Sequence, residues 1–266
     1  MSYVDVLKAE YKLVYSEVFR RKTALVTLVL YPYIFTAFTL FVGYAAGSPR
    51  MFVERVGVDP VVYMITASFM LMSILVSIDE LLWRPLFDTY IGTITYILAS
   101  PISRLKLYSA IPIPRLTLLA FMGFTSIVPV YTVYYGLSGL VLGLVVVAVL
   151  VVGCLVMIPF AIVVTTTVHR VGESWRALNI VRPLMMVLLG VYYPRTYMPL
   201  VGYIISSLIP SSHVVEVVQR LLTGMQGNLF TLFVIAFILA FTYTPLGQFT
   251  LKAWEHKKVK EGVRTS

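Results

Sequence analysis

Long apolar segments alternate with short polar ones along this chain, and the pattern predicts a bundle of membrane-spanning helices. Residues 23–49 carry no charge, and a second apolar segment covers residues 60–78. Residues 116–168 contain no Lys, Arg, Asp, Glu or His over 53 positions, which is long enough for two spans with a turn at residues 136–139. Since a transmembrane helix requires about 20 apolar residues, we assign spans one to four to these segments.

Prolines interrupt the apolar segments of the second half more often. After a polar loop at residues 169–182, we predict a fifth span around residues 183–194 and a broken, re-entrant pair of half-helices within residues 196–212. Non-helical backbone at membrane depth is tolerated only where protein or water covers it. A sixth span is predicted over residues 228–251. The fold class expected is therefore an all-α integral membrane protein.

A charged amphipathic segment precedes the first span. Apolar residues recur there at spacings of four and three, which places them on one face of a helix. They are Tyr3, Leu7, Tyr11, Val14 and Val18. Such a helix lies in the plane of the membrane surface. The predicted organisation is an N-terminal interfacial helix (residues 1–22), a transmembrane domain (residues 23–251) and a basic tail (residues 252–266).

The composition supports a location in lipid. Of the 266 residues, 59% are apolar and only 12% are charged, and the mean hydropathy is +0.89. Soluble domains carry roughly 25% charged residues, and a core of this size cannot hide so large a deficit. The single cysteine, Cys154, excludes an intrachain disulfide and a thiolate metal cluster.

The net charge of +9 is distributed as an orientation signal. With six spans the termini share one side, and that side holds seventeen of the Lys and Arg residues against four on the other. The positive-inside rule places the basic side in the cytoplasm, so we predict a multi-pass protein of the cell membrane with both termini cytoplasmic. There is no basic stripe with interleaved aromatic residues, and we expect contact with lipid but not with nucleic acid.

A polar segment separates spans two and three. Residues 86–106, LFDTYIGTITYILASPISRLK, lie between two strongly apolar segments. Their length suits a short helix at the cytoplasmic membrane surface, and Pro101 is expected to end that helix sharply. An inert loop would not require a Gly-Thr pair before an apolar-periodic run. We therefore favour a helix that another protein holds.

Motifs for catalysis are missing from the sequence. There is no phosphate-binding loop and no His-Glu-x-x-His zinc motif. His169, His213 and His256 fall in loop-like segments and are expected to be solvated or interfacial. The predicted spans carry almost none of the ionisable groups that proton relays need. We place the remaining arginines at span boundaries, because an arginine at a helix centre costs about 2.5–3.5 kcal/mol. Neither an enzyme nor a bound cofactor is expected in this chain.

The polar segment also carries a family resemblance. Residues 92–104, GTITYILASPISR, resemble the Gly-Thr-Leu-Glu-x-Leu-Leu-x-Ser/Thr-Pro-x-Ser-Arg signature of the ABC-2 type (type V exporter) permeases. In that family the segment is the coupling helix, which docks into a groove of a separate ATPase subunit. The resemblance implies that the residues coupling to the ATPase are Asp88, Gly92, Thr93, Thr95, Ser100, Pro101, Ser103 and Arg104.

Two later segments strengthen the resemblance. Residues 189–194, LGVYYP, followed by Met198-Pro199, are similar to the family pattern around the fifth span, and residues 210–220 are similar to its closing pattern. The residues that these matches place in the re-entrant or exit region are Gly190, Tyr193, Pro194, Pro199, Pro210, His213, Glu216 and Arg220. A spacing of four also predicts that Glu216 and Arg220 pair with each other at the outer surface. The alternative is that they line the exit of a substrate path.

The resemblance implies a permease subunit that pairs with itself or with a paralogous permease. Two copies of an ATPase subunit would bind Mg-ATP outside this chain. Short external loops favour export of a hydrophobic or amphipathic substrate, such as a drug, a lipid or a polysaccharide. Thr95 replaces the acidic residue of the family signature, so docking must differ here, through Asp88, Arg104 or Lys106. The rival interpretations are an ion-coupled secondary transporter or channel without an ATPase, and a membrane-anchoring or assembly component.

Overall fold

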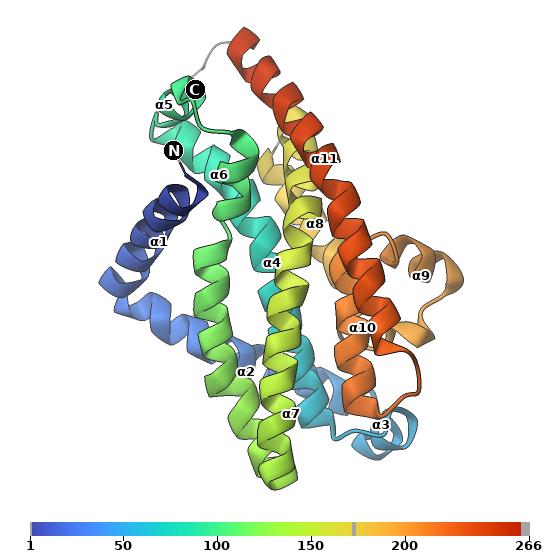
Figure 1. Cartoon of the computed structure of the whole chain (residues 1–266). Helices are drawn as coiled ribbons and strands as arrows, with labels where there is room; N and C mark the ends of the chain where they lie inside the picture. Colours follow the sequence, from blue (N-terminus) through green and yellow to red (C-terminus); the bar gives the residue numbers. More distant parts are fainter. Residues whose placement is uncertain (1, 172–173, 262–266) are drawn as a thin grey trace.

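The structure, a computed structural model, describes residues 2–171 and 174–261, and the elements that these residues form are all helices (Figure 1). They are α1 (Tyr3–Arg20), α2 (Lys22–Ala46), α3 (Pro49–Val56), α4 (Pro60–Tyr90), α5 (Ile94–Ala99), α6 (Arg104–Ala110), α7 (Ile113–Val171), α8 (Ser174–Leu189), the 3-10 helix η1 (Arg195–Tyr197), α9 (Leu200–Ser206), α10 (Pro210–Thr223) and α11 (Leu229–Glu261). The predicted all-α class is confirmed for this part of the chain. Met1, residues 172–173 of the predicted polar loop and residues 262–266 of the predicted tail lie outside the described residues.

Several helices have the length and composition of membrane spans. Three candidates are single stretches of the chain, namely α4, the segment Arg104–Arg170, which reverses at Gly136, and α11. Two bent pairs, α2 with α3 and α9 with α10, raise the number to five if each pair is counted as one span. The bends are 102° and 113°. The described residues therefore form a helical bundle of membrane-protein character, with fewer clear spans than the six predicted.

The long helix α7 is two helices packed against each other. Gly136 has φ +63° and ψ −142°, which is not helical, and the chain reverses direction there (Figure 1). A Cβ on Gly139 would lie 2.0 Å from the carbonyl oxygen of Tyr131, and one on Gly143 would lie 3.1 Å from the Cα of Val128. Only glycine allows so close an approach. The reversal lies at the start of the turn predicted at residues 136–139.

α4 is the central helix of the bundle. From Pro60 to Leu82 none of its residues is exposed, as expected of a helix segment that others surround. Val62, Ile74 and Leu81 have no exposed surface. The hydroxyl oxygens of Thr66 and Tyr131 lie 2.8 Å apart and join α4 to α7 in the core.

Two predicted boundaries are wrong. α4 does not end at residue 78 but continues to Tyr90, because both acidic residues after position 78 have partners on other helices. Asp79 accepts from Arg182 at 2.8 Å, and Glu80 forms an ion pair with Arg115, with 2.9 Å between Oε1 and Nε. The predicted polar loop at residues 169–182 is also largely helical, since α7 continues to Val171 and α8 begins at Ser174. Charged residues that face a partner helix do not interrupt a helix.

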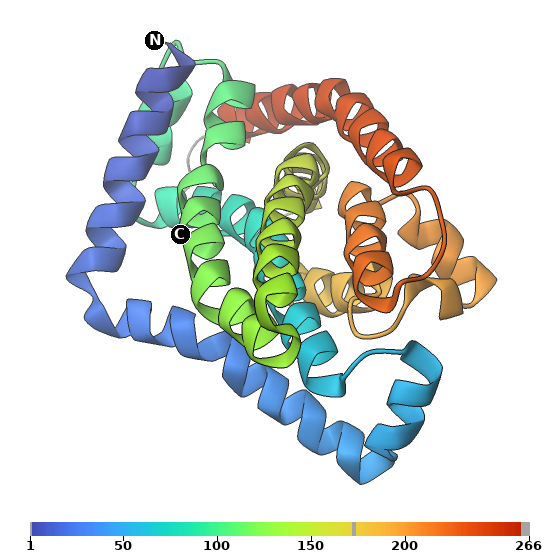
Figure 2. The ribbon, with the colours of Figure 1, turned by 60° about the horizontal axis from the view of Figure 1, so that its bottom comes forward.

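α1 and α2 form an arm along the outside of the bundle, and α2 runs obliquely across it (Figure 2). The buried residues of α1 are Val6, Glu10, Val14 and Val18. Of the predicted apolar face, only Val14 and Val18 are buried, whereas Tyr3, Leu7 and Tyr11 are half-buried beside it. The buried stripe is displaced because it includes the charged Glu10, whose partner is Arg84 on α4.

Candidate functional site

The segment after α4 forms the predicted short helix at a defined place. Gly92 has φ +78°, a left-handed conformation that ends α4, and its Cβ position is open. α5 follows at Ile94 and ends at Ala99, with Ser100 in an extended conformation before Pro101. A left-handed glycine after one helix and a proline shortly after the next are common end signals. The Gly-Thr and Ser-Pro pairs of the sequence thus delimit α5 on both sides.

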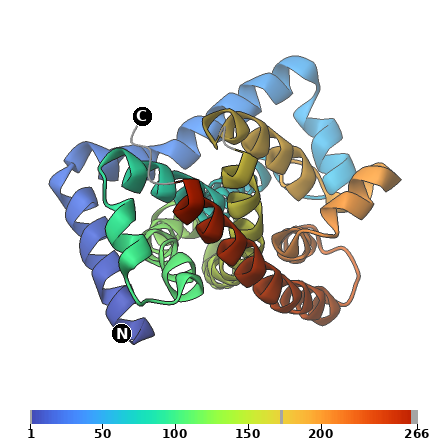
Figure 3. The same cartoon turned by 90° about the horizontal axis from the view of Figure 1, so that it is seen from above.

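α5 has an inner and an outer face. Ile94 is buried and Leu98 packs against the core, whereas Thr95 and Tyr96 point outward. Tyr96 is 78% exposed. α5 lies at the same end of the bundle as the start of α1 and the end of α11 (Figures 1 and 3). An outward-facing helix of this kind is accessible to a partner protein.

Arg104 ties the end of α5 to the rest of the bundle. Its Nη2 donates to the carbonyl oxygen of Leu98 at 2.7 Å, and its Nη1 donates to those of Ser100 and Ile102. Its Nε donates to the carboxylate of Glu255 on α11 at 2.9 Å. A cation at these carbonyls satisfies the unpaired C-terminal groups of α5. Ser103 precedes Arg104 and is exposed.

Asp88 also acts within the fold. It is 5% exposed, accepts from Arg84 Nε at 3.0 Å and accepts from the hydroxyl of Thr93 at 2.8 Å. Since Asp88 and Arg104 already have internal partners, a protein bound to α5 would meet Thr95 and Tyr96 first, with the exposed Lys106 beyond them.

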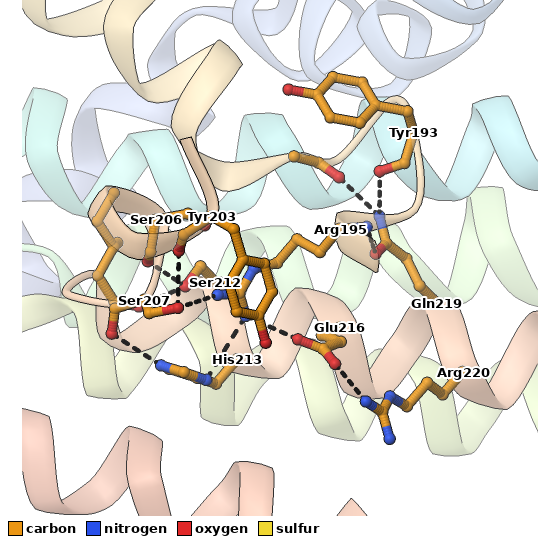
Figure 4. A network of polar contacts seen from close by, with 12 residues as sticks. Tyr193, Arg195, Tyr203, Ser206, Ser207, Ser212, His213, Glu216, Gln219 and Arg220 are labelled. Atoms are coloured by element: carbon orange, nitrogen blue, oxygen red, sulfur yellow. Dashed lines mark hydrogen bonds and ion pairs between the residues drawn. The ribbon is translucent and has the colours of Figure 1, made fainter. Parts of the chain in front are cut away.

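The second candidate region lies around α10, away from the end of the bundle that carries α5 (Figure 1), and Figure 4 shows its side chains. We call it the Arg195 network, and its members are Arg195, Ser207, His213, Glu216, Gln219 and Arg220. Its centre is the guanidinium of Arg195, which has no exposed surface. Nη1 donates to Glu216 at 2.9 Å and Nη2 donates to Ser207 at 2.9 Å. The guanidinium also lies 4.9 Å from the ring centroid of Tyr203.

Glu216 is shared by two arginines. Its second carboxylate oxygen accepts from Arg220, one helical turn later. The predicted pairing of Glu216 with Arg220 is therefore present, but Glu216 is 2% exposed and does not lie at the surface. Two guanidinium groups around one carboxylate leave a local excess of positive charge. Buried charges persist only when they are paired and hydrogen-bonded.

His213 supports the same network and is buried, contrary to the expectation of a solvated side chain. Its Nε2 lies 2.9 Å from the carbonyl oxygen of Ser207, which can only accept, so Nε2 carries the hydrogen. Its Nδ1 faces Arg195 Nη1 at 3.5 Å. This arrangement favours the neutral ring, because Nδ1 must then accept from the guanidinium. His169 is also buried, and only His256 is exposed.

Gln219 holds the irregular segment between α8 and α9. Its Nε2 donates to the carbonyl oxygens of Gly190 and Tyr193 at 2.7 and 3.0 Å, and its Oε1 accepts from the backbone N–H of Arg195 at 3.0 Å. Its Nε2 also lies 3.2 Å from the hydroxyl of Tyr63 on α4. One amide side chain thus supplies hydrogen-bond partners to three backbone groups that are not paired within a helix.

Of the eight residues predicted for the re-entrant or exit region, His213, Glu216 and Arg220 are members of this network. The carbonyl oxygens of Gly190 and Tyr193 accept from its Gln219. Pro194, Pro199 and Pro210 each precede or begin a helix, at the starts of η1, α9 and α10. Sequence reasoning missed the roles of Arg195 and Gln219. It placed Arg195 at a span boundary and did not foresee that the side chain is buried. The available signal was a lone arginine between two proline-bounded apolar segments. Such an arginine must find a buried partner if the segment packs inside the protein.

An apolar cavity of about 420 Å³ adjoins the same segment. It opens between α2, α3 and residues 192–197. Tyr44, Tyr192, Tyr197 and Arg55 are among the residues that line it. This volume and lining suit an apolar or amphipathic group.

No cluster of His, Cys, Asp and Glu that could hold a metal ion occurs in residues 2–171 and 174–261. Comparison of the chain with protein-family models, with curated proteins and with solved structures finds no match. The functional interpretation therefore depends on the residues and geometry described above.

Proposed function

We propose that this chain is the transmembrane permease subunit of an ATP-driven exporter. The carrying observation is α5, a short outward-facing helix that is fixed at both ends to long helices of the bundle. Asp88 and Thr93 hold its start to α4, and Arg104 and Glu255 hold its end to α11. A force applied to α5 would therefore move at least two long helices. This is what a membrane subunit driven by a separate motor requires.

The remaining features fit the same function. The basic residues at the end of the bundle that carries α5 favour a cytoplasmic position, where an ATPase subunit has access. On this proposal the six crossings would be α2, α4, the two halves of α7, α8 and α11. The apolar cavity near Tyr193 favours a hydrophobic or amphipathic substrate. ATP with Mg²⁺ would bind to the partner, and a second copy or a paralogous permease would complete the transport path.

Site-directed labelling and crosslinking test this proposal together. Thr95→Cys and Gln226→Cys place exposed thiols at the two ends of the bundle, and the native Cys154 is buried. A membrane-impermeant maleimide should label position 95 only in inverted vesicles and position 226 only in intact cells. A photoreactive amino acid at position 96 should then crosslink to a protein with a phosphate-binding loop, whereas the same group at position 226 should not. Labelling of position 95 from outside, or no ATPase among the crosslinked proteins, would refute the proposal.

One observation favours a second candidate, an ion-coupled transporter without an ATPase. Buried ionisable groups in membrane segments often mark ion or proton paths. In the Arg195 network, Glu216 and His213 both contact the buried Arg195. Transport by purified protein in liposomes, driven by a proton gradient without nucleotide and lost in Glu216→Gln, would support this candidate over the first.

A further inference from the structure

A continuous series of polar contacts connects α1 to the start of α5. Arg84 on α4 lies at its centre. Its Nη1 and Nη2 donate to the two carboxylate oxygens of Glu10 on α1, at 3.0 and 3.2 Å. Its Nε donates to Asp88 at 3.0 Å, and the other oxygen of Asp88 accepts from the hydroxyl of Thr93 at 2.8 Å. Thr93 is the residue immediately before α5.

This series is shielded from solvent, unlike the other ion pair of α1. Glu10 is 4% exposed and the side chain of Arg84 is 20% exposed. Burial raises the pKa of the Glu10 carboxyl, and the adjacent guanidinium of Arg84 acts in the opposite direction. Glu10 therefore depends on Arg84 for its charge. By contrast, the side chains of Arg21 and Glu17 are 72% and 48% exposed, and such a pair contributes little.

α1 has few other means of holding this position. Three valines form its buried apolar stripe, and the hydroxyl of Tyr15 lies 3.2 Å from that of Thr117. Tyr3, Leu7, Tyr11 and Tyr15 are half-buried beside this stripe, and apart from the buried Glu10 the remaining residues of α1 face outward. Its docking is therefore weaker than that of the central helices, and its single buried charge contributes a large share. Elements with few buried contacts open at low free energy cost.

From this arrangement we propose that α1 is a control arm for α5, and that Arg84 is the positioning residue through which it acts. While α1 is docked, Glu10 fixes the guanidinium of Arg84, which orients Asp88 and so holds Thr93 and the start of α5. When α1 leaves the bundle, Arg84 loses two of its three carboxylate contacts, and α5 becomes mobile. A change at the membrane surface that displaces α1 would thereby change how α5 meets a partner. This regulatory role rests on the proposed function, whereas the structural coupling itself does not.

Hydrogen exchange of the full-length protein in lipid nanodiscs tests the coupling. The variant is Glu10→Ala, and the matched control is Glu17→Ala, which removes the same group from the same helix outside the series. We expect exchange of the amides of residues 94–99 to rise on the order of tenfold in Glu10→Ala, as the loss of one charged hydrogen-bonded contact implies. Exchange in α10 should be unchanged, and Glu17→Ala should match the wild type.

A second pair of variants tests the last contact of the series. Thr93→Val removes the hydroxyl that Asp88 accepts from, and Thr93→Ser retains it, so only the valine variant should increase exchange in α5. An unchanged α5 in Glu10→Ala, or an equal rise in α5 and α10, would overturn the inference. Either outcome leaves the permease proposal standing. If α5 loosens as expected but no ATPase crosslinks at position 96, the permease proposal fails and the coupling remains.

Discussion

Replacing Glu216 by glutamine should destabilise the protein more than its small change in shape suggests. The substitution keeps the volume and one oxygen acceptor but removes the only carboxylate within hydrogen-bond distance of both Arg195 and Arg220 in the described structure. Arg195 has no exposed surface, so its charge would remain buried without a counterion. Removing one partner of a buried ion pair costs about 3–5 kcal/mol. We therefore expect a loss of free energy of unfolding of that size.

The size of the effect can be separated from simple loss of packing. Arg220→Met removes the more exposed partner, whose side chain is 19% exposed, and leaves the pair of Arg195 with Glu216 in place. We expect it to cost only about 1–2 kcal/mol. Replacing Arg195 and Glu216 together by apolar residues should recover part of the loss, because a buried pair exchanged for apolar packing is often near neutral.

Thermal unfolding in detergent measures all three variants. With a slope of about 2–4 °C per kcal/mol, Glu216→Gln should lower the Tm by roughly 6 °C or more, and Arg220→Met by clearly less. A Tm of Glu216→Gln within about 2 °C of the wild type would show that the carboxylate does not neutralise Arg195. Glu216 would then not be the counterion on which the buried Arg195 depends.

Three further substitutions test other parts of the fold. Gly139→Ala places a Cβ 2.0 Å from the carbonyl oxygen of Tyr131 and should cost about 3 kcal/mol or more, whereas Gly202→Ala, whose Cβ position is open, should be neutral in the same unfolding assay. Gln219→Leu leaves two carbonyl oxygens and one backbone N–H unpaired, so it should cost about 2–4 kcal/mol and should increase hydrogen exchange in residues 190–197. Gly92→Ala, at φ +78°, should cost about 1 kcal/mol and should increase protease cleavage between α4 and α5; unchanged cleavage would count against the turn described there.

The elements that local sequence determines were predictable. Glycine and proline at residues 92 and 101 delimit α5, and the reversal within α7 occurs at Gly136, where the sequence predicts a turn. Both depend on backbone conformations that the residue type itself sets. The all-helical class was also predictable, because it follows from the length of the apolar segments.

The features that depend on distant partners were not predictable. α4 continues beyond Asp79 because Arg182 neutralises it, and the two residues are 103 positions apart. The buried stripe of α1 includes Glu10 because Arg84, 74 positions away, faces it. Apolar residues that recur at spacings of three and four predict the buried face of a helix. The same pattern predicts that charged residues face solvent, unless their partners are known. The same reasoning placed the buried Arg195 at a boundary.

α4 contacts both polar regions of the protein, the Arg195 network and the contacts at the start of α5. Near the start of α4, the hydroxyl of Tyr63 contacts Gln219 in the Arg195 network. Near its end, Asp88 contacts Thr93, the residue before α5. At 1.5 Å per residue these two points are about 38 Å apart along the helix, and the intervening residues are largely buried. A closely packed helix transmits displacement because its core does not compress. On the proposed function, a force on α5 would therefore reach the segment that Gln219 holds, next to the apolar cavity. The polar contacts at the two ends of α4 would then be the places where such a force enters the bundle and leaves it.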